Sequence, residues 1–296
     1  MANRRVLVKR RKSVKNIRKI TRTMQLIATA RFQATHDRAL ASRPYSDKLG
    51  ELVADLSRAA GDVDHPLMRT GGDAGRSELV VLTSNRGLCG GYNANVLRRA
   101  IDFSDGLSAD HKVDVDMVGK KGIAYFRFLD RGLDRTYVDF SEDPKFEEVE
   151  PLANDLMRRF EEGEVDSVHV AYMRFESTSR QTPTVLQLLP LEPLDAEPAA
   201  DSTEETTGAT ASEYEFSPSP EELLDALLPA SVRMRLFQCF LDATVSEHVA
   251  RMVAMKAATD AAGDMIKSLT RQYNRARQTH ITMELLDILG GVNALE

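Results

Sequence analysis

The longest continuous hydrophobic pattern of the chain lies at its C-terminal end. Between Pro220 and the glycine pair at 290–291, only Pro229 and Gly263 interrupt it. The roughly 60 residues beyond Pro229 would form a helix about 90 Å long at 1.5 Å per residue. The pattern therefore predicts one helix from about Pro220 to about Leu289, which is longer than a compact domain is wide.

Apolar and small residues recur along this helix at steps of three and four, which is typical of a coiled coil. The two seam positions hold Met252, Thr259, Ile266, Tyr273 and His280, and Met255, Ala262, Leu269, Ala276 and Met283. Because alanine, threonine and histidine bury little apolar area, the seam is weak. A weak seam indicates that a further partner surrounds the helix.

A second helical pattern runs from Lys12 to about Ser57. Its apolar residues at similar steps, which we expect to face the C-terminal helix, are Ile17, Ile20, Met24, Ile27, Ala34 and Ala41. Long helices at opposite ends of the chain predict an antiparallel pair. The C-terminal helix is longer by about twenty residues, so its apolar end, from Ile281 onward, is expected to be unpaired and to need cover.

Between these helices the pattern changes to short alternating elements. It predicts strands at 78–84, 112–118, 136–140 and 167–175, and helices at 92–103, 122–129 and 146–160. This alternation is typical of βαβ units and of a mainly parallel sheet. A strand at 184–189, after a turn at Thr182 and Pro183, is expected to pair antiparallel at the edge.

The predicted fold class is α/β, with a long antiparallel coiled coil and a Rossmann-like α/β domain. The predicted segments are an N-terminal helix (1–60), the Rossmann-like domain (61–190), an acidic disordered loop (191–217) and the C-terminal helix (218–296). The loop carries eight acidic residues and no lysine or arginine, among proline, alanine, serine and threonine.

Composition narrows the class of protein. The 296 residues are 42% hydrophobic and 28% charged, enough for one globular domain besides the helices. No apolar run approaches about 18 residues, and the N-terminus lacks the apolar core of a signal peptide, so we expect a chain in the cytoplasm or on the cytoplasmic face of a membrane. Cys89 and Cys239 are isolated and are expected to be buried thiols.

The net charge of −6 hides a basic N-terminal region, because residues 1–36 hold eleven lysines or arginines and no acid. Three interpretations are open. A nucleic-acid arm would fit the charge, but no aromatic residues alternate with the basic ones to stack bases. A solvated helix face and a partner with acidic loops are the others.

The glycine-rich stretch from Ser84 to Asn93 lies where the first strand meets the next helix. A dinucleotide enzyme cradles a pyrophosphate there, but Gly87, Gly90 and Gly91 do not fit the G-x-G-x-x-G spacing. A tight strand-to-helix turn is the favoured interpretation. Six scattered histidines show no metal-ligand spacing, and no residue has the sequence context of a nucleophile, so we expect no catalytic, cofactor or metal site.

Separated stretches of the chain together resemble one known family. They are 9–30 (KRRKSVKNIRKITRTMQLIATA), 83–93 (TSNRGLCGGYN), 250–263 and 273–285, and they resemble the gamma subunit of the F-type ATP synthase. The resemblance implies a rotor, present once per complex, inside a hexamer of alternating alpha and beta subunits. Its sheet domain would lie beside the epsilon subunit and the membrane ring, peripheral on the cytoplasmic face of a bacterial plasma membrane. No catalysis and no nucleic acid are implied.

The same resemblance suggests contact residues. Met24 falls where the shaft of the family nears an acidic loop of the beta subunit; the polar positions facing the hexamer are Arg251, Arg277, Gln278, Thr282 and Glu284. Asn85 departs from the usual aspartate, and 29–32 reads Thr-Ala-Arg-Phe where Ser-Lys-Met is common. The acidic loop lacks a cysteine pair, so the redox switch of chloroplast relatives is expected to be absent. A coiled-coil nucleic-acid-binding or scaffold protein, and an enzyme with a Rossmann-like domain, are the alternatives.

Overall fold

The computed structural model describes residues 4–60, 65–69, 74–107, 111–191 and 219–293. The helices are α1 (Arg4–Ala60), a short 3-10 helix (Pro66–Met68), α2 (Tyr92–Gly106), α3 (Lys120–Phe128), α4 (Phe146–Glu161) and α5 (Pro220–Asn293). The strands are β1 (Arg76–Leu82), β2 (Lys112–Val118), β3 (Arg135–Tyr137), β4 (Ser167–Phe175) and β5 (Gln181–Leu189). Contacts divide the chain into two compact units: the helix-pair unit (Met1–Arg31 with His248–Glu296) and the sheet unit (Phe32–Glu247).

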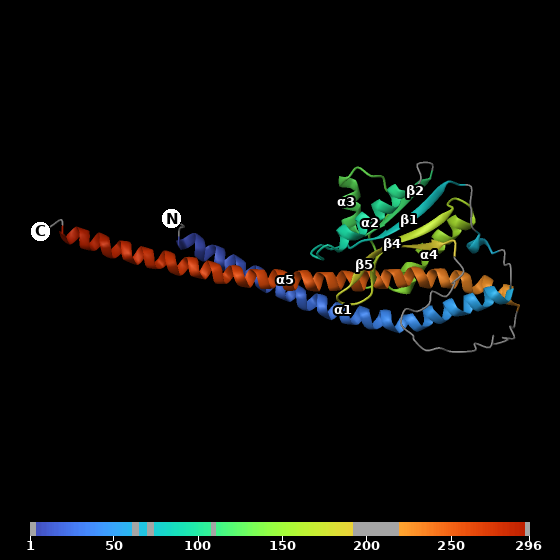
Figure 1. Cartoon of the computed structure of the whole chain (residues 1–296), viewed down its shortest axis with the longest axis horizontal. Coiled ribbons are helices and arrows are strands. Elements are labelled where there is room, and N and C mark those ends of the chain that lie inside the picture. Colours follow the sequence, from blue (N-terminus) through green and yellow to red (C-terminus); the bar gives the residue numbers. More distant parts are fainter. Residues whose placement is uncertain (1–3, 61–64, 70–73, 108–110, 192–218, 294–296) are drawn as a thin grey trace, which may run out of the picture. The chain divides into compact units, whose positions relative to one another are not determined.

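The sheet unit is built on five strands in the order β3-β2-β1-β4-β5. All pairings are parallel except that of β5 with β4, so the predictions of a mainly parallel sheet and of an antiparallel edge strand are confirmed. Figure 1 shows α2 and α3 over one face and α4 on the other. Because both faces are covered, the central strand β1 is buried along almost its whole length, from Ser77 to Leu82.

The structure corrects the bounds of several predicted elements. Strand β1 covers Arg76–Leu82 and not 78–84, β3 covers Arg135–Tyr137 and not 136–140, and β5 begins at Gln181 and not at Thr184. The turn expected at Thr182 and Pro183 is wrong, since both residues pair within β5. Proline is tolerated there because β5 is an edge strand, whose outer side needs no N–H donor. Helix α1 begins at Arg4, eight residues before the helical pattern that starts at Lys12 but within the predicted N-terminal segment 1–60.

Within the sheet unit, the first part of α5 packs on the sheet through aromatic side chains. The ring of Phe237 meets that of Phe146 edge to face at 5.7 Å, and Phe240 lies 4.9 Å from Phe140. The Ser246 hydroxyl donates a hydrogen bond of 3.1 Å to the carbonyl oxygen of Met173. This stretch of α5 is buried on most of its sides, which explains its lack of a clear polar face.

In the helix-pair unit, α1 and α5 form an antiparallel pair, as predicted. Leu7 and Val14 of α1 share one small core with Leu269 and Ala262 of α5. The hydroxyl groups of Thr259 and Thr21 are 2.8 Å apart, and the guanidinium of Arg11 lies 5.2 Å from the ring centre of Tyr273. Low residue numbers on α1 thus face high numbers on α5. The predicted α5 seam is buried or half-buried from Met252 to Ala276, whereas His280 and Met283 are exposed.

The α1 seam, however, is not the predicted one. The side chains of Ile17, Ile20, Met24 and Ile27 are 52%, 57%, 36% and 49% exposed, and Ala34 and Ala41 are also exposed. The residues that face α5 recur at steps of seven: Leu7, Val14, Thr21 and Ala28. The alternate seam position holds the polar residues Arg11, Arg18 and Gln25, which a hydrophobic pattern does not count, and the Arg11 guanidinium lies over the ring of Tyr273.

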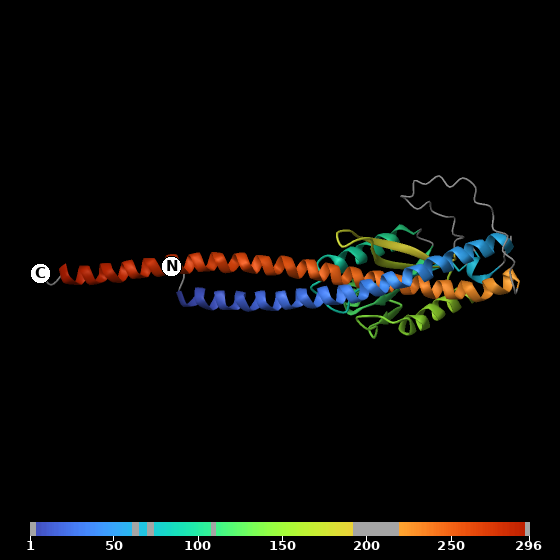
Figure 2. The same cartoon turned by 90° about the horizontal axis from the view of Figure 1, so that it is seen from below.

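None of the described helices pairs with the last part of α5. Figures 1 and 2 both show the red end of α5 running beyond the first residues of α1, and all side chains from Ile281 to Leu289 are exposed. The expectation of an unpaired apolar end is confirmed. The predicted acidic loop at 191–217 lies, apart from Leu191, outside the described residues. No helix among the described residues has the length and apolarity to cross a membrane.

Candidate functional site

The helix-pair unit carries an apolar stripe on the side of α1 that does not form the seam. It consists of Ile17, Ile20, Met24 and Ile27, which we call the outward stripe. Because they follow one another at steps of three and four, these side chains lie on one face of the helix. Single exposed apolar residues are ordinary, but four large ones in a row form a surface that indicates a binding partner. The sequence pattern found these residues and assigned them to the wrong face.

A second apolar surface is the bare end of α5, residues 281–289. Six large apolar side chains are exposed there: Ile281, Met283, Leu285, Leu286, Ile288 and Leu289. In a helix their positions point to several sides, and α1 covers none of them. A surface of this kind fits a partner that surrounds the helix better than one that docks on a single side.

Four of the predicted contact residues lie within about two turns next to or on this end. Arg277, Gln278, Thr282 and Glu284 are all exposed. The Thr282 hydroxyl donates to the Gln278 carbonyl oxygen at 3.1 Å, and Glu284 Oε1 is 3.0 Å from His280 Nδ1. These local contacts leave the charged ends of the side chains at the surface.

The other two predicted contact residues lie elsewhere on the helix pair. Arg251 is half-buried and about 39 Å from Arg277 along α5, at 1.5 Å per residue. Met24 belongs to the outward stripe. The structure thus brings together the four residues near the bare end of α5 and separates them from the other two.

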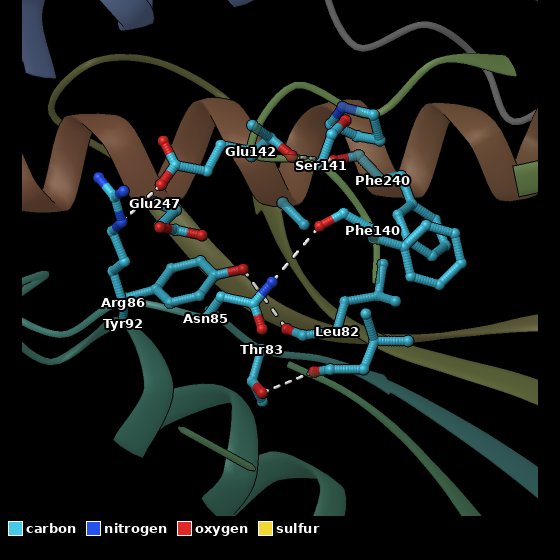
Figure 3. Close-up of a pocket in the computed structure, with 14 residues that line it drawn as sticks. Leu82, Thr83, Asn85, Arg86, Tyr92, Phe140, Ser141, Glu142, Phe240 and Glu247 are labelled. Carbon is cyan, nitrogen blue, oxygen red and sulfur yellow. Dashed lines mark hydrogen bonds and ion pairs between the residues drawn. The ribbon is translucent and has the colours of Figure 1, made fainter. Parts of the chain in front are cut away.

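The glycine-rich loop forms a small cleft at the carboxyl ends of β1 and β2, where Rossmann-like folds often bind ligands (Figure 3). Its polar groups are already used by the protein. Thr83 Oγ1 donates to the Val118 carbonyl oxygen at 2.7 Å, and Arg86 Nε lies 2.6 Å from Glu142 Oε1. Glu247 of α5 also lines the cleft and would repel a phosphate. The geometry favours a structural turn over a nucleotide site.

The backbone of this loop supports the same interpretation. Leu88 and Gly90 have positive φ angles of 66° and 57°, and the Asn93 side-chain oxygen accepts a hydrogen bond of 2.9 Å from the Ser84 N–H. The prediction of a tight strand-to-helix turn therefore fits the observed geometry. Both cysteines are free and buried, as predicted, and burial raises the pKa of Cys239 to about 12. Among the described residues no cluster of three or more potential ligands could hold a metal ion.

Comparison with known proteins agrees with this arrangement over the whole chain. The family model described as ATP synthase matches residues 3–295. An ATP synthase gamma chain from Rhodopirellula baltica is 46% identical over all of both chains, and one from Frankia casuarinae is 41% identical over 97% of this chain and 96% of its own. A chain in a cryo-EM structure of the Euglena gracilis mitochondrial ATP synthase (OSCP/F1/c-ring, rotational state 3) covers 99% of this chain and 94% of its own, with a TM-score of 0.64. At 18% identity it shows the shared fold. The chain belongs to the ATP synthase gamma chain family.

Proposed function

We propose that this chain is the central rotor stalk of an F-type ATP synthase, which couples ion-driven rotation of the membrane ring to ATP synthesis or hydrolysis at the alpha/beta hexamer. The observation that carries the proposal is the pair of uncovered apolar surfaces, the outward stripe and the bare end of α5. Each lies on the helix pair, and neither is covered by the residues that the structure describes. A sleeve of alpha and beta subunits around a single shaft would cover both.

In this role the chain binds and turns but makes and breaks no covalent bond. A shaft changes the state of its neighbours only as far as its contacts differ between those states. The helix pair can provide such differences because its sides are unlike: apolar along the outward stripe, basic over much of the first turns of α1, and polar at Arg277, Gln278, Thr282 and Glu284. Each rotary position would then present a different side to a given beta subunit. We assign Met24 and Arg251 to the same set of contacts.

We assign the sheet unit to the foot of the stalk, beside the epsilon subunit and the membrane ring. The Euglena assembly named above contains F1 and a c-ring, which supports partners of this kind. The similarity to gamma chains of bacteria supports a peripheral position on the cytoplasmic face of the plasma membrane. The chain needs no cofactor in this role, and one copy serves each complex.

The substitution Met24→Asp tests the assignment of the outward stripe. Since the Met24 side chain is 36% exposed, an aspartate there should change the stability of the chain alone by less than about 0.5 kcal/mol. In the assembled head the same charge would meet apolar or acidic neighbours without a partner, at a cost of about 1–3 kcal/mol. We therefore expect normal folding but weaker assembly or slower ATP turnover.

Leu40→Asp is the matched control, because Leu40 is 47% exposed on α1 outside the outward stripe. It should leave assembly and ATP turnover near the wild-type level. Both variants are measured by urea unfolding of the chain, by co-purification with alpha and beta subunits, and by ATPase activity of the complex. Equal effects of the two variants on the assembled complex would show that the outward stripe is not a specific contact. Recovery of the wild-type chain with nucleic acid in a salt-sensitive complex would favour the alternative function.

A further inference from the structure

One face of the sheet completely excludes two acidic side chains on neighbouring strands from solvent, beneath α4. Glu78 on β1 and Asp116 on β2 both have side chains that are 0% exposed. Asp116 pairs with Val80, so Glu78, two residues earlier on β1, projects from the same face in the diagonal position. An ionised carboxylate in such a place is costly unless a cation and hydrogen-bond donors compensate it.

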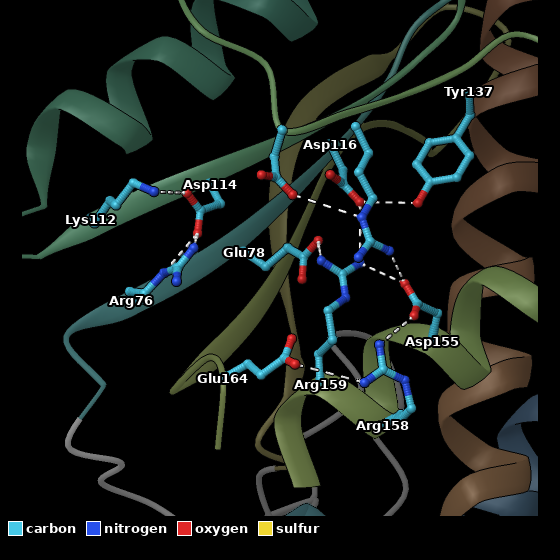
Figure 4. A network of polar contacts seen from close by, with 12 residues as sticks. Arg76, Glu78, Lys112, Asp114, Asp116, Tyr137, Asp155, Arg158, Arg159 and Glu164 are labelled. Carbon is cyan, nitrogen blue, oxygen red and sulfur yellow. Dashed lines mark hydrogen bonds and ion pairs between the residues drawn. The ribbon is translucent and has the colours of Figure 1, made fainter. Parts of the chain in front are cut away.

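A single buried guanidinium serves both acids, as Figure 4 shows. Arg159 of α4 contacts Glu78 Oε1 through Nη1 and lies 3.3 Å from Asp116 Oδ2 through Nη2. It also contacts the partly exposed Asp155 at 3.0 Å. The Tyr137 hydroxyl donates to Asp116 Oδ2 at 3.2 Å. With both buried acids ionised, their charge would exceed that of the one buried cation.

One oxygen of each acid marks the place where the excess negative charge can be neutralised. Glu78 Oε2 and Asp116 Oδ1 are buried, and neither has a hydrogen-bond partner in the part of the chain that the structure describes. A protonated carboxyl group donates one hydrogen bond, and a carboxylate accepts it. Burial, followed by the neighbouring carboxyl group of Asp116, raises the pKa of Glu78 to about 8, against the opposing effect of Arg159.

We propose that Glu78 and Asp116 form a proton-binding site, which holds one proton between the two carboxyl groups at neutral pH and stabilises the sheet unit while it is occupied. Other ionisable side chains lie near these two carboxyl groups on each of the neighbouring elements. They are Arg76, Lys112, Asp114, Asp134, Arg135, Tyr137, Asp155, Arg158, Arg159 and Glu164. Arg76 and Lys112 pair with Asp114, and Arg158 pairs with Asp155. Arg135 also pairs with Asp155, so within the described part of the chain Arg159 remains the one buried cation that touches both acids.

The sign of the pH dependence follows from this arrangement. The ordinary pKa of a glutamate is 4.5, so the unfolded chain has released this proton above that pH. The folded chain keeps the proton up to about pH 8. The stabilisation is fully present below 4.5 and is lost as pH rises through about 8. Across that window this site should raise the unfolding constant about tenfold per pH unit, and above it the contribution should be constant.

Glu78→Gln is the test variant, because its amide NH₂ can donate to Asp116 as the protonated carboxyl does but cannot lose the proton. The ratio of the unfolding constants of wild type and variant is measured on the full chain by urea unfolding from about pH 5 to about pH 10. The unfolding constant of the wild type divided by that of the variant should rise about tenfold per pH unit up to about pH 8 and then stay level. A ratio that is flat over the whole range overturns the proposal.

Asp114→Asn is the matched control, two residues from Asp116 on the same face of β2. Burial raises the pKa of Asp114, but hydrogen bonds from Lys112 and Arg76 outweigh it, and the pKa is lowered. Its stabilisation is present at neutral and alkaline pH and lost only as pH falls through the acidic range. The same ratio for this control should therefore stay level from about pH 5 upward.

A second measurement does not depend on the folding of any variant. The infrared spectrum of the folded wild-type chain should contain the carbonyl band of a buried protonated carboxylic acid at pH 7, and this band should disappear above about pH 9. Glu78→Gln should lack the band, whereas Asp114→Asn should keep it. Absence of the band from the wild type at pH 7 contradicts the proton-binding site.

Discussion

Gly119, which joins β2 to α3, shows how a single residue limits the packing of the sheet unit. Its φ angle is +97°, and an added Cβ would lie 2.2 Å from the carbonyl oxygen of Thr83. Gly119→Ala should therefore lower the free energy of unfolding by more than about 2 kcal/mol. Gly132→Ala, where an added Cβ meets nothing within 4 Å, should change it by less than about 0.5 kcal/mol. Urea unfolding of both variants checks this, and equal stability of the two would contradict the close approach to Thr83.

Arg277 tests the proposed contact at the residue scale. An exposed guanidinium off the seam contributes little to folding, whereas a charge-assisted contact with beta, closed to solvent, contributes about 1.5–3 kcal/mol. Arg277→Ala should thus leave folding and assembly intact but slow ATP hydrolysis and ion-driven synthesis. The measurement is both activities in assembled complexes, with co-purification of the chain as the control. Unchanged activities in an intact complex would show that Arg277 makes no such contact.

At the scale of elements, the seam of the helix pair and the outward stripe of α1 predict different responses to truncation. Leu269 of α5 is buried in the seam, so Leu269→Ala should cost about 2–5 kcal/mol in the helix-pair unit. Ile20 lies on the outward stripe, and Ile20→Ala should change the stability of the chain alone by less than about 0.5 kcal/mol. Thermal unfolding followed by helical circular dichroism gives both values. A cost at Ile20 comparable to that at Leu269 would mean that Ile20 faces the seam.

The same elements show what sequence patterns can and cannot predict. The alternating elements predicted a mainly parallel sheet with an antiparallel edge strand, and the α5 seam was placed correctly from Met252 to Ala276. The α1 seam was not, because hydrophobicity favours the isoleucines over Thr21 and Ala28. Small residues at the seam allow close approach of the helices, and a Cβ added at Gly263 would lie 3.8 Å from Arg18 Nε. Only the contacts across the pair reveal which stripe is turned inward.

The candidate site was predicted more by resemblance than by pattern. The unpaired apolar end of α5 could be expected from helix length alone, and the structure confirms it. The polar contact residues carry no local signal, since exposed charges such as Arg277 are common on any helix. The buried acids Glu78 and Asp116 were missed for a related reason. Each is one acidic residue in an apolar strand, and only the sheet register places both under Arg159.

At the scale of the whole molecule, α1 and α5 each contribute residues to both units. Rotation of the sheet unit would therefore be transmitted to the helix pair through the continuous backbone of these two helices. This is the central claim of a rotor. It requires that the chain turn inside a head whose other subunits stay fixed. Binding measurements alone do not distinguish a rotating shaft from a static scaffold, because both would form a tight complex with the head.

Single-molecule rotation tests the claim most directly. The head is assembled from alpha and beta subunits with this chain and fixed to a surface through beta. A visible probe is attached at Asp102→Cys, an exposed position on α2, while the native Cys89 and Cys239 are buried. On addition of ATP we expect sustained rotation of the probe in one direction. A probe that stays still while the same heads hydrolyse ATP would contradict it.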